Sequence, residues 1–536
     1  MKFLAAALLL AVSLRTLAQA PPPIDENVPP PSDNYALGPD SKGQPTGKTF
    51  SFELTNSKIF PETTRTITVY VPAAYAGDKP ACVYVGLDGL GFNAATVFDH
   101  LIAQHAMPVT VGIGISPGAV ESARSPEDPR FDRSFEFDSR SDRLARFVIE
   151  EVLPAVEQHS IRLSTNPDDR AIGGGSTGAI AAFTVAWERP DAFRRVFSSI
   201  GTYVGMRGGE QYYVLVRKTE PKPLRIFMQD GVHDEWPGGP EMGDWWMSNL
   251  TMNRALEFAG YDVRHVWGTG THNGAQAAAI FPDAMRWLWR DWPEPIHAAA
   301  PGNPVLKSIL QPGEDWQIVA GACAPPLAAD PKGELQCSPS DDAVAFGADG
   351  KRYLASDLGM KVRNLTVRNN GDIYGVTSDE LWLIRSTGEK LKLDEGLKGA
   401  SGLAVSPDGL WLFVAQSLSR SGLSYRIRSD GTVDAREPFY DFYVPAWADD
   451  SGAGAVAMDE DGRAYVATRL GVQVFDRNGR VTAILPLPGN LPATSLCFTG
   501  DLLYVSAGEK LYRRKLNIKG AQPWAAPTKL PPWGAG

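Results

Sequence analysis

The sequence has few cysteines, no run of basic residues, and a single long apolar stretch. Its four cysteines are too few for a disulfide-rich scaffold, although Cys323 and Cys337 could form one bridge, and none has the paired spacing of a zinc site. Lysine and arginine total 52 against 62 acidic residues, which gives a net charge of −10. These absences argue against nucleic acid and against a membrane as partners.

The one long apolar stretch lies at the N-terminus and has the features of a secretory signal. Lys2 gives a positive start, Phe3 to Leu14 is almost wholly apolar, and Ala18-Gln19-Ala20 is a small-x-small cleavage site. The stretch is too short to span a bilayer comfortably. We therefore expect residues 1–20 to be a cleaved signal peptide and the mature protein to be secreted or periplasmic.

The composition and the pattern of predicted strands and helices change twice along the remaining chain, which predicts two domains. Residues 21–48 are rich in Pro, Gly, Ser and Asp and are expected to be a flexible linker. Residues 49–298 alternate strand and helix patterns, as in a parallel sheet covered on both faces. A second linker is expected at 299–314, and 315–520 form the second domain. The first domain's strands are expected at 64–71, 81–87, 108–114, 170–173, 195–200, 224–229 and 262–267, and its main helices at 141–158, 178–188, 247–259 and 281–291.

Short strands separated by glycine turns characterise the second domain. The glycines at 333, 350, 371, 388 and 409 are alternately about 17 and 21 residues apart, which indicates four-stranded units of about 40 residues. A β-sandwich is the alternative, but nine such turns favour repetition. The prediction is a β-propeller of five or six blades.

Two G-x-S-x-G pentapeptides are candidates for a nucleophile elbow, the sharp turn that presents a catalytic serine. In the first, Pro117 follows Ser116 and has no N–H to stabilise an oxyanion. In the second, Ser176 follows a predicted strand and opens an apolar helix, as an elbow requires. Ser176 is therefore the predicted nucleophile.

A serine nucleophile requires a base and an acid, which follow it in this order in α/β-hydrolases: Ser, Asp or Glu, His. His272 lies in a glycine-rich loop after the last predicted strand and before a helix, so it is the predicted base. The loop after strand 224–229 offers Asp230, Asp234 and Glu235. Asp234 is preferred as the acid because it lies inside the loop, whereas Asp230 at the strand end could stabilise the turn.

Further residues are expected to contact the substrate. The N–H groups of Thr177, which follows the nucleophile, and of Leu90, in the loop after strand 81–87, are the predicted oxyanion donors. Trp236, Trp245 and Trp246 lie near the acid and could stack on a sugar or phenolic ring, although core packing is the better explanation for any one of them.

The first domain resembles the esterase D and enterobactin-esterase type of α/β-hydrolase, which includes acetyl xylan and feruloyl esterases of carbohydrate esterase family one. The resemblance rests on Arg133 to Asp138 (RSFEFD), AIGGGSTGAIAAF around Ser176, QDGVHDEW around Asp234, and GTGTHNG around His272. It implies a serine esterase fold and activity. It also implies that the acid ends a G-x-x-D stretch, which here runs from Gly231 to Asp234.

The second domain resembles the gluconolactonase and senescence-marker (regucalcin-like) propellers in SGLAVSPDGLWLFVA, AMDEDGRAYVATRLGVQVFDRNGRV and LLYVSAGEKLYRRK. That resemblance implies a calcium site and a lactonase substrate site. Pro325, Ser401 and Gly454 stand where the family has its metal ligands, and Arg363 stands where it has a substrate-binding Asn. Because two of these have no side-chain donor, we expect neither calcium nor any other cofactor, and no lactonase activity.

The predicted function is therefore an exported serine carboxylester hydrolase with a non-catalytic propeller. A small-molecule or polysaccharide ester is the expected substrate, with acetyl or feruloyl esters of plant polysaccharide preferred. A siderophore esterase is one alternative. The other is a metal-dependent lactonase or a binding activity in the propeller.

Overall fold

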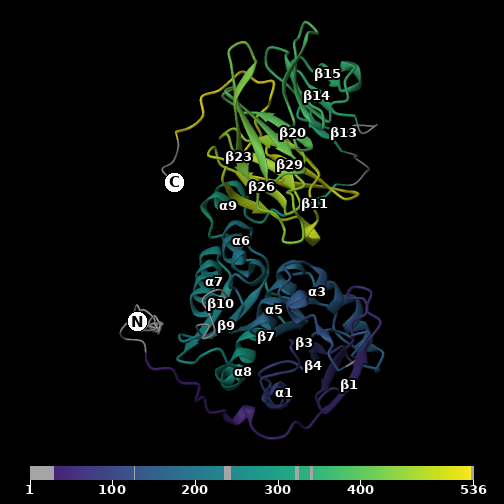
Figure 1. Cartoon of the computed structure of the whole chain (residues 1–536). Helices are drawn as coiled ribbons and strands as arrows, with labels where there is room; N and C mark the ends of the chain where they lie inside the picture. Colours follow the sequence, from purple (N-terminus) through teal and green to yellow (C-terminus); the bar gives the residue numbers. More distant parts are fainter. Residues whose placement is uncertain (1–28, 126, 235–242, 320–324, 338–341, 533–536) are drawn as a thin grey trace, which may run out of the picture.

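The computed structural model describes residues 29–125, 127–234, 243–319, 325–337 and 342–532. The predicted signal peptide lies outside the described residues. Within them, no helix is both long and apolar enough to cross a membrane. Figure 1 shows an α/β domain in the N-terminal half and a β-propeller in the C-terminal half, with α6 and α9 near their junction. The two predicted architectures are both present.

One eight-stranded sheet organises the first domain, in the order β1-β2-β4-β3-β7-β8-β9-β10. From β4 onwards neighbouring strands are parallel, whereas β2 is antiparallel to both β1 and β4. The strands are β1 (Lys48–Leu54), β2 (Arg65–Val71), β3 (Cys82–Leu87), β4 (Thr110–Ile115), β7 (Arg170–Gly175), β8 (Arg195–Ser199), β9 (Arg225–Gly231) and β10 (Asp262–Gly268). The short strands β5 (Ala119–Val120) and β6 (Arg130–Phe131) pair outside this sheet.

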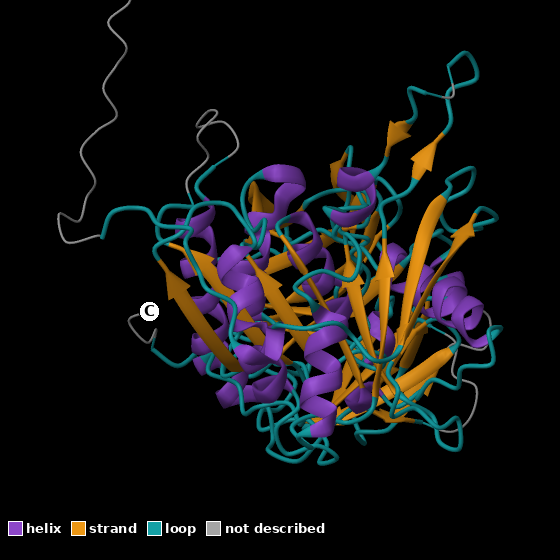
Figure 2. Ribbon diagram, turned by 90° about the horizontal axis from the view of Figure 1, so that it is seen from below, coloured by secondary structure: helices purple, strands orange, loops and turns teal. Residues whose placement is uncertain are grey.

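Helices cover both faces of the sheet, as Figure 2 shows in a view along it. On one face pack α3 (Arg143–Arg146), α4 (Leu153–Glu157), α5 (Thr177–Glu188), α6 (Tyr212–Lys218) and α7 (Trp245–Ala259), and on the other α1 (Ala94–Ala103) and α8 (Ala275–Leu288). A short α2 (Arg133–Phe137) precedes α3, and a π-helical segment (Phe147–Val152) joins α3 to α4. The predicted helix 141–158 is thus a helix whose middle is widened to the π form.

The number of blades in the propeller was predicted wrongly. The described residues form four four-stranded blades, not five or six: β16–β19, β20–β23, β24–β27, and a last blade in which β11 joins β28, β29 and β30. Between the last blade and β16 lie two two-stranded hairpins, β12–β13 and β14–β15. The glycine turns at 333 and 350 belong to these hairpins. The prediction from turn spacing therefore counted these two-stranded hairpins as parts of four-stranded blades.

The blade strands are short and mostly buried. Their bounds are β11 (Gln317–Ile318), β12 (Leu327–Ala329), β13 (Leu335–Cys337), β14 (Val344–Phe346), β15 (Arg352–Leu354), β16 (Asn364–Val367), β17 (Ile373–Val376), β18 (Glu380–Ile384), β19 (Lys390–Glu395), β20 (Ala400–Val405), β21 (Trp411–Gln416), β22 (Ser421–Ile427), β23 (Val433–Asp441), β24 (Val456–Met458), β25 (Ala464–Thr468), β26 (Gly471–Phe475), β27 (Val481–Leu485), β28 (Ser495–Thr499), β29 (Leu502–Ala507) and β30 (Lys510–Lys515). Cys337 is disulfide-bonded, while Cys323 lies outside the described residues.

Polar contacts join the two domains. Asn490 of the propeller donates to the backbone oxygen of Glu188 at 2.6 Å and to its carboxylate at 3.2 Å, and it accepts from the Lys222 ammonium at 3.2 Å. Arg514 forms a two-bonded ion pair with Glu220. The helix α9 (Pro304–Ile309) begins at Asn303, whose side chain bonds carbonyl oxygens of both domains. The propeller is therefore fastened to the α/β domain through buried charged groups.

Candidate active site

The nucleophile elbow lies between β7 and α5. Ser176 has φ 55° and ψ −123°, a strained conformation for a residue with a side chain. The turn requires small neighbours, because a Cβ on Gly174 would lie 2.6 Å from the Gly178 carbonyl carbon. The Ser176 N–H donates to the Ser199 carbonyl at the end of β8. The local sequence G-G-S-T-G thus places the Ser176 hydroxyl at the carboxyl end of the sheet.

The loops that carry the acid and the base run side by side. Val232 N–H donates to Gly268 O, and His233 N–H donates to Gly270 O. A Cβ on Gly231 would lie 2.1 Å from Gly270 O, so only glycine permits this approach. Because β9 and β10 are parallel, both loops leave the sheet at the edge where Ser176 lies.

The three predicted catalytic side chains meet at this edge. His272 Nε2 lies 2.9 Å from Ser176 Oγ. On the other side of the ring, His272 Nδ1 lies 2.8 and 2.9 Å from the two oxygens of Asp234, whose side chain is fully buried. This is the hydrogen-bonded order of nucleophile, base and orienting acid.

Trp245 supports the imidazole. Its ring centroid lies 5.1 Å from that of His272, and its indole N–H donates to Thr202 Oγ1, which is 3.3 Å from Ser176 Oγ. Because Trp245 is only 2% exposed, it offers no face for stacking on a substrate. Trp246 is half-buried, and its ring meets Trp267 edge to face. Trp236 lies outside the described residues.

The two predicted oxyanion donors lie in adjacent loops. Thr177 is the first residue of α5, where N–H groups have no acceptor within the helix. The loop of Leu90 follows β3, which pairs with β7 so that Leu87 lies opposite Gly174. Leu90 N packs against Gly114 of β4, where a Cβ would approach it to 2.4 Å. The structure therefore places the two loops next to each other, and the role of the two N–H groups as oxyanion donors stays a prediction.

An ion pair that sequence reasoning missed holds this loop. Arg133 donates two hydrogen bonds, of 2.8 and 2.6 Å, to the carboxylate of Asp88, which begins the Leu90 loop with φ 67°. The hydrogen bonds that Arg133 donates to Asp88 raise the pKa of Arg133. Arg133 is the first residue of the RSFEFD stretch, and its place in that motif was the sequence signal from which a role at the site could have been predicted. The motif's Glu136 is instead structural, because it forms a fully buried pair with Arg65.

Asp230, the alternative acid, lies next to the side chain of Asp234. It is fully buried at the end of β9, and its Oδ1 accepts from Gly231 N–H at 2.7 Å. Burial, followed by the neighbouring Asp234 carboxylate, raises the pKa of Asp230 well above its ordinary value. Burial and the neighbouring carboxylate therefore favour the protonated form of Asp230, whereas Asp234 makes the bonds to His272.

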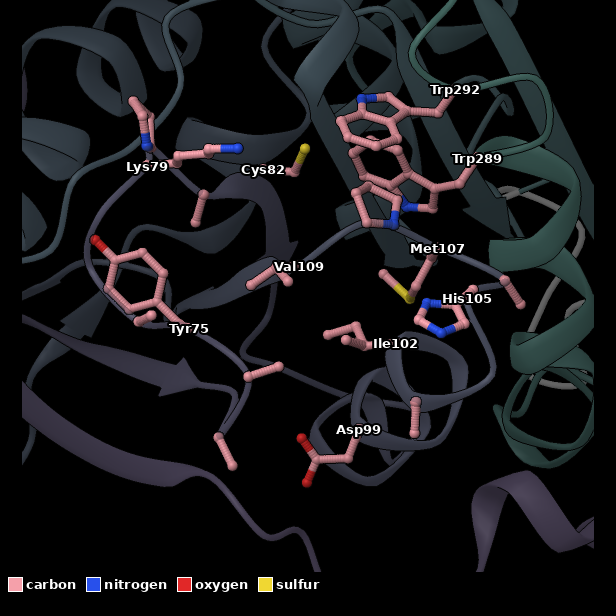
Figure 3. A pocket seen from close by; sticks show the side chains of 18 of the residues that line it. Tyr75, Lys79, Cys82, Asp99, Ile102, His105, Met107, Val109, Trp289 and Trp292 are labelled. Atoms are coloured by element: carbon pink, nitrogen blue, oxygen red, sulfur yellow. The ribbon is translucent and has the colours of Figure 1, made fainter.

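Ser116, the serine of the rejected pentapeptide, has no histidine partner among the described residues. Its hydroxyl donates to Thr66 O and accepts from Thr66 N–H at the edge of the sheet. The large cavity of about 880 Å³ in Figure 3 also lies away from the triad. It opens at Cys82 and Val109, the amino-terminal side of β3 and β4, with Trp289 and Trp292 on one side. The triad occupies the opposite, carboxyl edge.

The residues at the propeller positions that correspond to the calcium ligands do not fit a metal site. The Ser401 hydroxyl donates to the carbonyl of Ala453. Gly454 has no side chain, and a Cβ there would lie 2.1 Å from Thr494 O. Among the described residues, no group of three or more His, Cys, Asp or Glu is placed to hold a metal ion. Pro325 and Arg363, the other two positions, supply no carboxylate.

Comparison with known proteins finds a similar family model for each of the two domains. Residues 57–318 match the family model "Putative esterase", and 344–509 match "SMP-30/Gluconolactonase/LRE-like region". No curated protein matches the chain.

Solved structures with local similarity include three of interest. The enterobactin esterase of Shigella flexneri, with 2,3-dihydroxy-N-benzoyl-glycine, is 19% identical over 47% of this chain and 62% of its own, with a TM-score of 0.36. A ferulic acid esterase is 16% identical over 46% and 98%, with a TM-score of 0.37. The gluconolactonase XC5397 of Xanthomonas campestris is 22% identical over 37% and 74%, with a TM-score of 0.29. This chain thus spans about three fifths of the length of the Shigella enzyme. By its family matches, this chain has a region similar to the putative-esterase family, followed by a region similar to the SMP-30/gluconolactonase-like family.

Proposed function

We propose that the protein is a serine carboxylester hydrolase that uses Ser176, His272 and Asp234. The observation that carries the proposal is the line of hydrogen bonds from Ser176 Oγ through the His272 ring to Asp234, at 2.9 and 2.8 Å. The elbow between β7 and α5 provides the expected setting for this line.

In the proposed mechanism, Ser176 Oγ attacks the ester carbonyl while His272 Nε2 accepts its proton. Asp234 fixes the imidazole with Nδ1–H towards the carboxylate and stabilises the imidazolium that forms. The N–H groups of Thr177 and Leu90 stabilise the oxyanion. His272 then protonates the leaving alcohol, and a water molecule, deprotonated by His272, releases the acid from the acyl-serine.

Active-site labelling tests this mechanism directly. A fluorophosphonate should modify the full-length wild-type protein at Ser176, in parallel with loss of p-nitrophenyl acetate hydrolysis. The Ser116→Ala variant should be labelled as fast as wild type, whereas Ser176→Ala should not be labelled. Labelling at another serine, or full hydrolysis by Ser176→Ala, would refute the proposal.

For the substrate we propose acetyl or feruloyl esters of plant polysaccharide. The support is the resemblance of the catalytic motifs to carbohydrate esterases, together with half-buried Trp246 beside the acid loop, whose indole could contact a sugar or phenolic ring. The alternative is a siderophore ester. Initial rates on acetylated xylan, methyl ferulate, a glucuronoyl ester and enterobactin separate these possibilities, and a preference for enterobactin would contradict the polysaccharide proposal.

We further propose that the protein is exported and that its propeller is neither a calcium site nor a lactonase. The N-terminal signal pattern supports export, and mass spectrometry of the mature N-terminus would test it. The engaged Ser401 hydroxyl and the closely packed Gly454 support a propeller without metal. Gluconolactone hydrolysis that survives Ser176→Ala and disappears with chelator would contradict this.

A further inference from the structure

The segment before β1, residues 29–47, lies against the loop that carries the base. It is called the strap here. Thr271 N–H donates to Asp33 Oδ1 and the Thr271 hydroxyl donates to Asp33 Oδ2, both at 2.7 Å. Thr269 N–H donates to the Tyr35 hydroxyl at 2.9 Å, and Ser32 N–H donates to Thr269 O. These bonds hold the residues immediately before His272.

The strap also reaches the loop of the acid. The ring nitrogen Nε2 of His233, next to Asp234, lies 2.6 Å from the carbonyl oxygen of Pro29. One segment therefore touches both loops that carry members of the triad.

The strap is fastened on its other side to regular structure. Asp40 accepts from Arg286 of α8 at 2.6 Å and from Gln104, which follows α1, at 2.8 Å. The backbone N–H and the hydroxyl of Thr46 donate to Asp99 of α1. Because α1 and α8 pack in the core of one sheet face, the strap is anchored at Asp40 and Thr46 to well-packed helices.

The loop that the strap holds contains three glycines, Gly268, Gly270 and Gly274. It runs from Gly268 to Gly274 without helix or strand beyond Gly268, and glycine carries the largest conformational freedom. A Cβ on Gly270 would lie 2.7 Å from Asp33 Oδ1, so the loop's glycine permits the close contact. Burial would raise the pKa of Asp33, but the hydrogen bonds from Thr271 outweigh it and keep the carboxylate charged at neutral pH.

We propose that Asp33 and Tyr35 are positioning residues for His272, so that ester hydrolysis depends on the docked strap. The inference rests on the proposed function of the triad. Asp33 binds two groups of Thr271 and so fixes the backbone from which the imidazole projects. Without it, the loop would populate conformations in which Nε2 is displaced from Ser176 Oγ. A displacement of about 1 Å in a catalytic group can cost about a hundredfold in rate.

The test compares three single variants of the full chain. Asp33→Ala removes both acceptors for Thr271, and Tyr35→Phe removes only the acceptor for Thr269 N–H. Asn34→Ala is the matched control, because Asn34 lies between them and is exposed. We expect Asp33→Ala to lower kcat about tenfold to a hundredfold with KM within about twofold. Tyr35→Phe should have a smaller effect, and Asn34→Ala should equal wild type.

Two further measurements separate positioning from general loss of structure. The Tm of Asp33→Ala should stay close to that of wild type, and the low-field NMR signal of the His272 Nδ1 proton should broaden. In a double-mutant cycle with Thr271→Val, the two losses should be less than additive, because both variants lose the bond between the Thr271 hydroxyl and Asp33. A kcat unchanged in Asp33→Ala, or lowered equally in Asn34→Ala, would overturn the inference. An inactive wild-type protein would instead refute the proposed function.

Discussion

Replacing Asp234 with asparagine and replacing Asp230 with asparagine should have very different effects on ester hydrolysis. Asp234 bonds His272 Nδ1 through both oxygens at 2.8 and 2.9 Å, and it is fully buried. In Asp234→Asn the amide can present its NH2 to the ring, which favours the tautomer protonated on Nε2, and that nitrogen can no longer accept the Ser176 proton. In a comparable triad this change costs about 10⁴-fold in kcat, or about 5.5 kcal/mol of transition-state stabilisation.

Asp230→Asn should be mild, because burial and the Asp234 carboxylate raise the pKa of Asp230 and so favour its neutral form. An amide has nearly the same shape as a neutral carboxylic acid and likewise combines a donor with an acceptor. The Gly231 N–H keeps its acceptor at the oxygen that remains. We expect a loss below about tenfold, which corresponds to about 1.4 kcal/mol.

The assay is kcat/KM for p-nitrophenyl acetate at neutral pH, with the Tm of each variant measured in the same buffer. The two variants should differ by about 4 kcal/mol in ΔΔG‡ with similar Tm values. If Asp230→Asn is the more damaging substitution while the fold is retained, the assignment of Asp234 as the orienting acid is refuted.

Four further outcomes are expected. Ser176→Ala and His272→Ala should each lower kcat by several orders of magnitude, checked by steady-state kinetics with circular dichroism as the folding control. Asn490→Ala should lower the free energy of unfolding in urea by about 3 kcal/mol, because buried groups at the domain junction lose a partner, whereas Asn478→Ala in an exposed turn should not. Burial lowers the pKa of Lys222 to about 8 in the folded protein, whereas the unfolded chain keeps this proton up to about pH 10.5. The free energy of unfolding of wild type, measured relative to Lys222→Met, should therefore rise by about 3 kcal/mol between pH 8 and 10.5. A difference that does not change with pH would contradict this. EDTA should leave both esterase turnover and Tm unchanged, and a calcium-dependent shift of Tm would show that the propeller binds metal.

The sequence predicts the strands of the parallel sheet well because most of them are short runs rich in apolar residues and bounded by glycine or polar residues. The predicted strand 262–267 differs from β10 by one residue. By contrast, β1 was not predicted, because it lies at the sheet edge and its side chains are exposed or only half-buried. The predicted number of blades was wrong for another reason. A glycine turn indicates a hairpin, but it does not indicate whether further strands pair with that hairpin to complete a blade.

The elbow and the base loop could be located because their chemistry is local in sequence. The contacts that support them are not local. Asp33 lies 238 residues from Thr271, and Arg133 lies 45 residues from Asp88. A linker rich in Pro, Gly, Ser and Asp looks the same whether or not its carboxylate finds a partner. The burial of Trp245 against His272 is likewise set by tertiary packing and leaves no periodic signal.

The contact between the domains also covers a sheet edge of the propeller that would otherwise be exposed. β27 is the outermost strand of its blade, and Thr219 of the α/β domain forms a parallel bridge with Ile484 on that strand, followed by Glu220 N–H donating to Ile484 O. Unpaired edge strands are templates for intermolecular strand pairing. A propeller produced without the first domain would expose this edge, so aggregation of the isolated fragment would reflect an uncovered strand rather than an inability to fold.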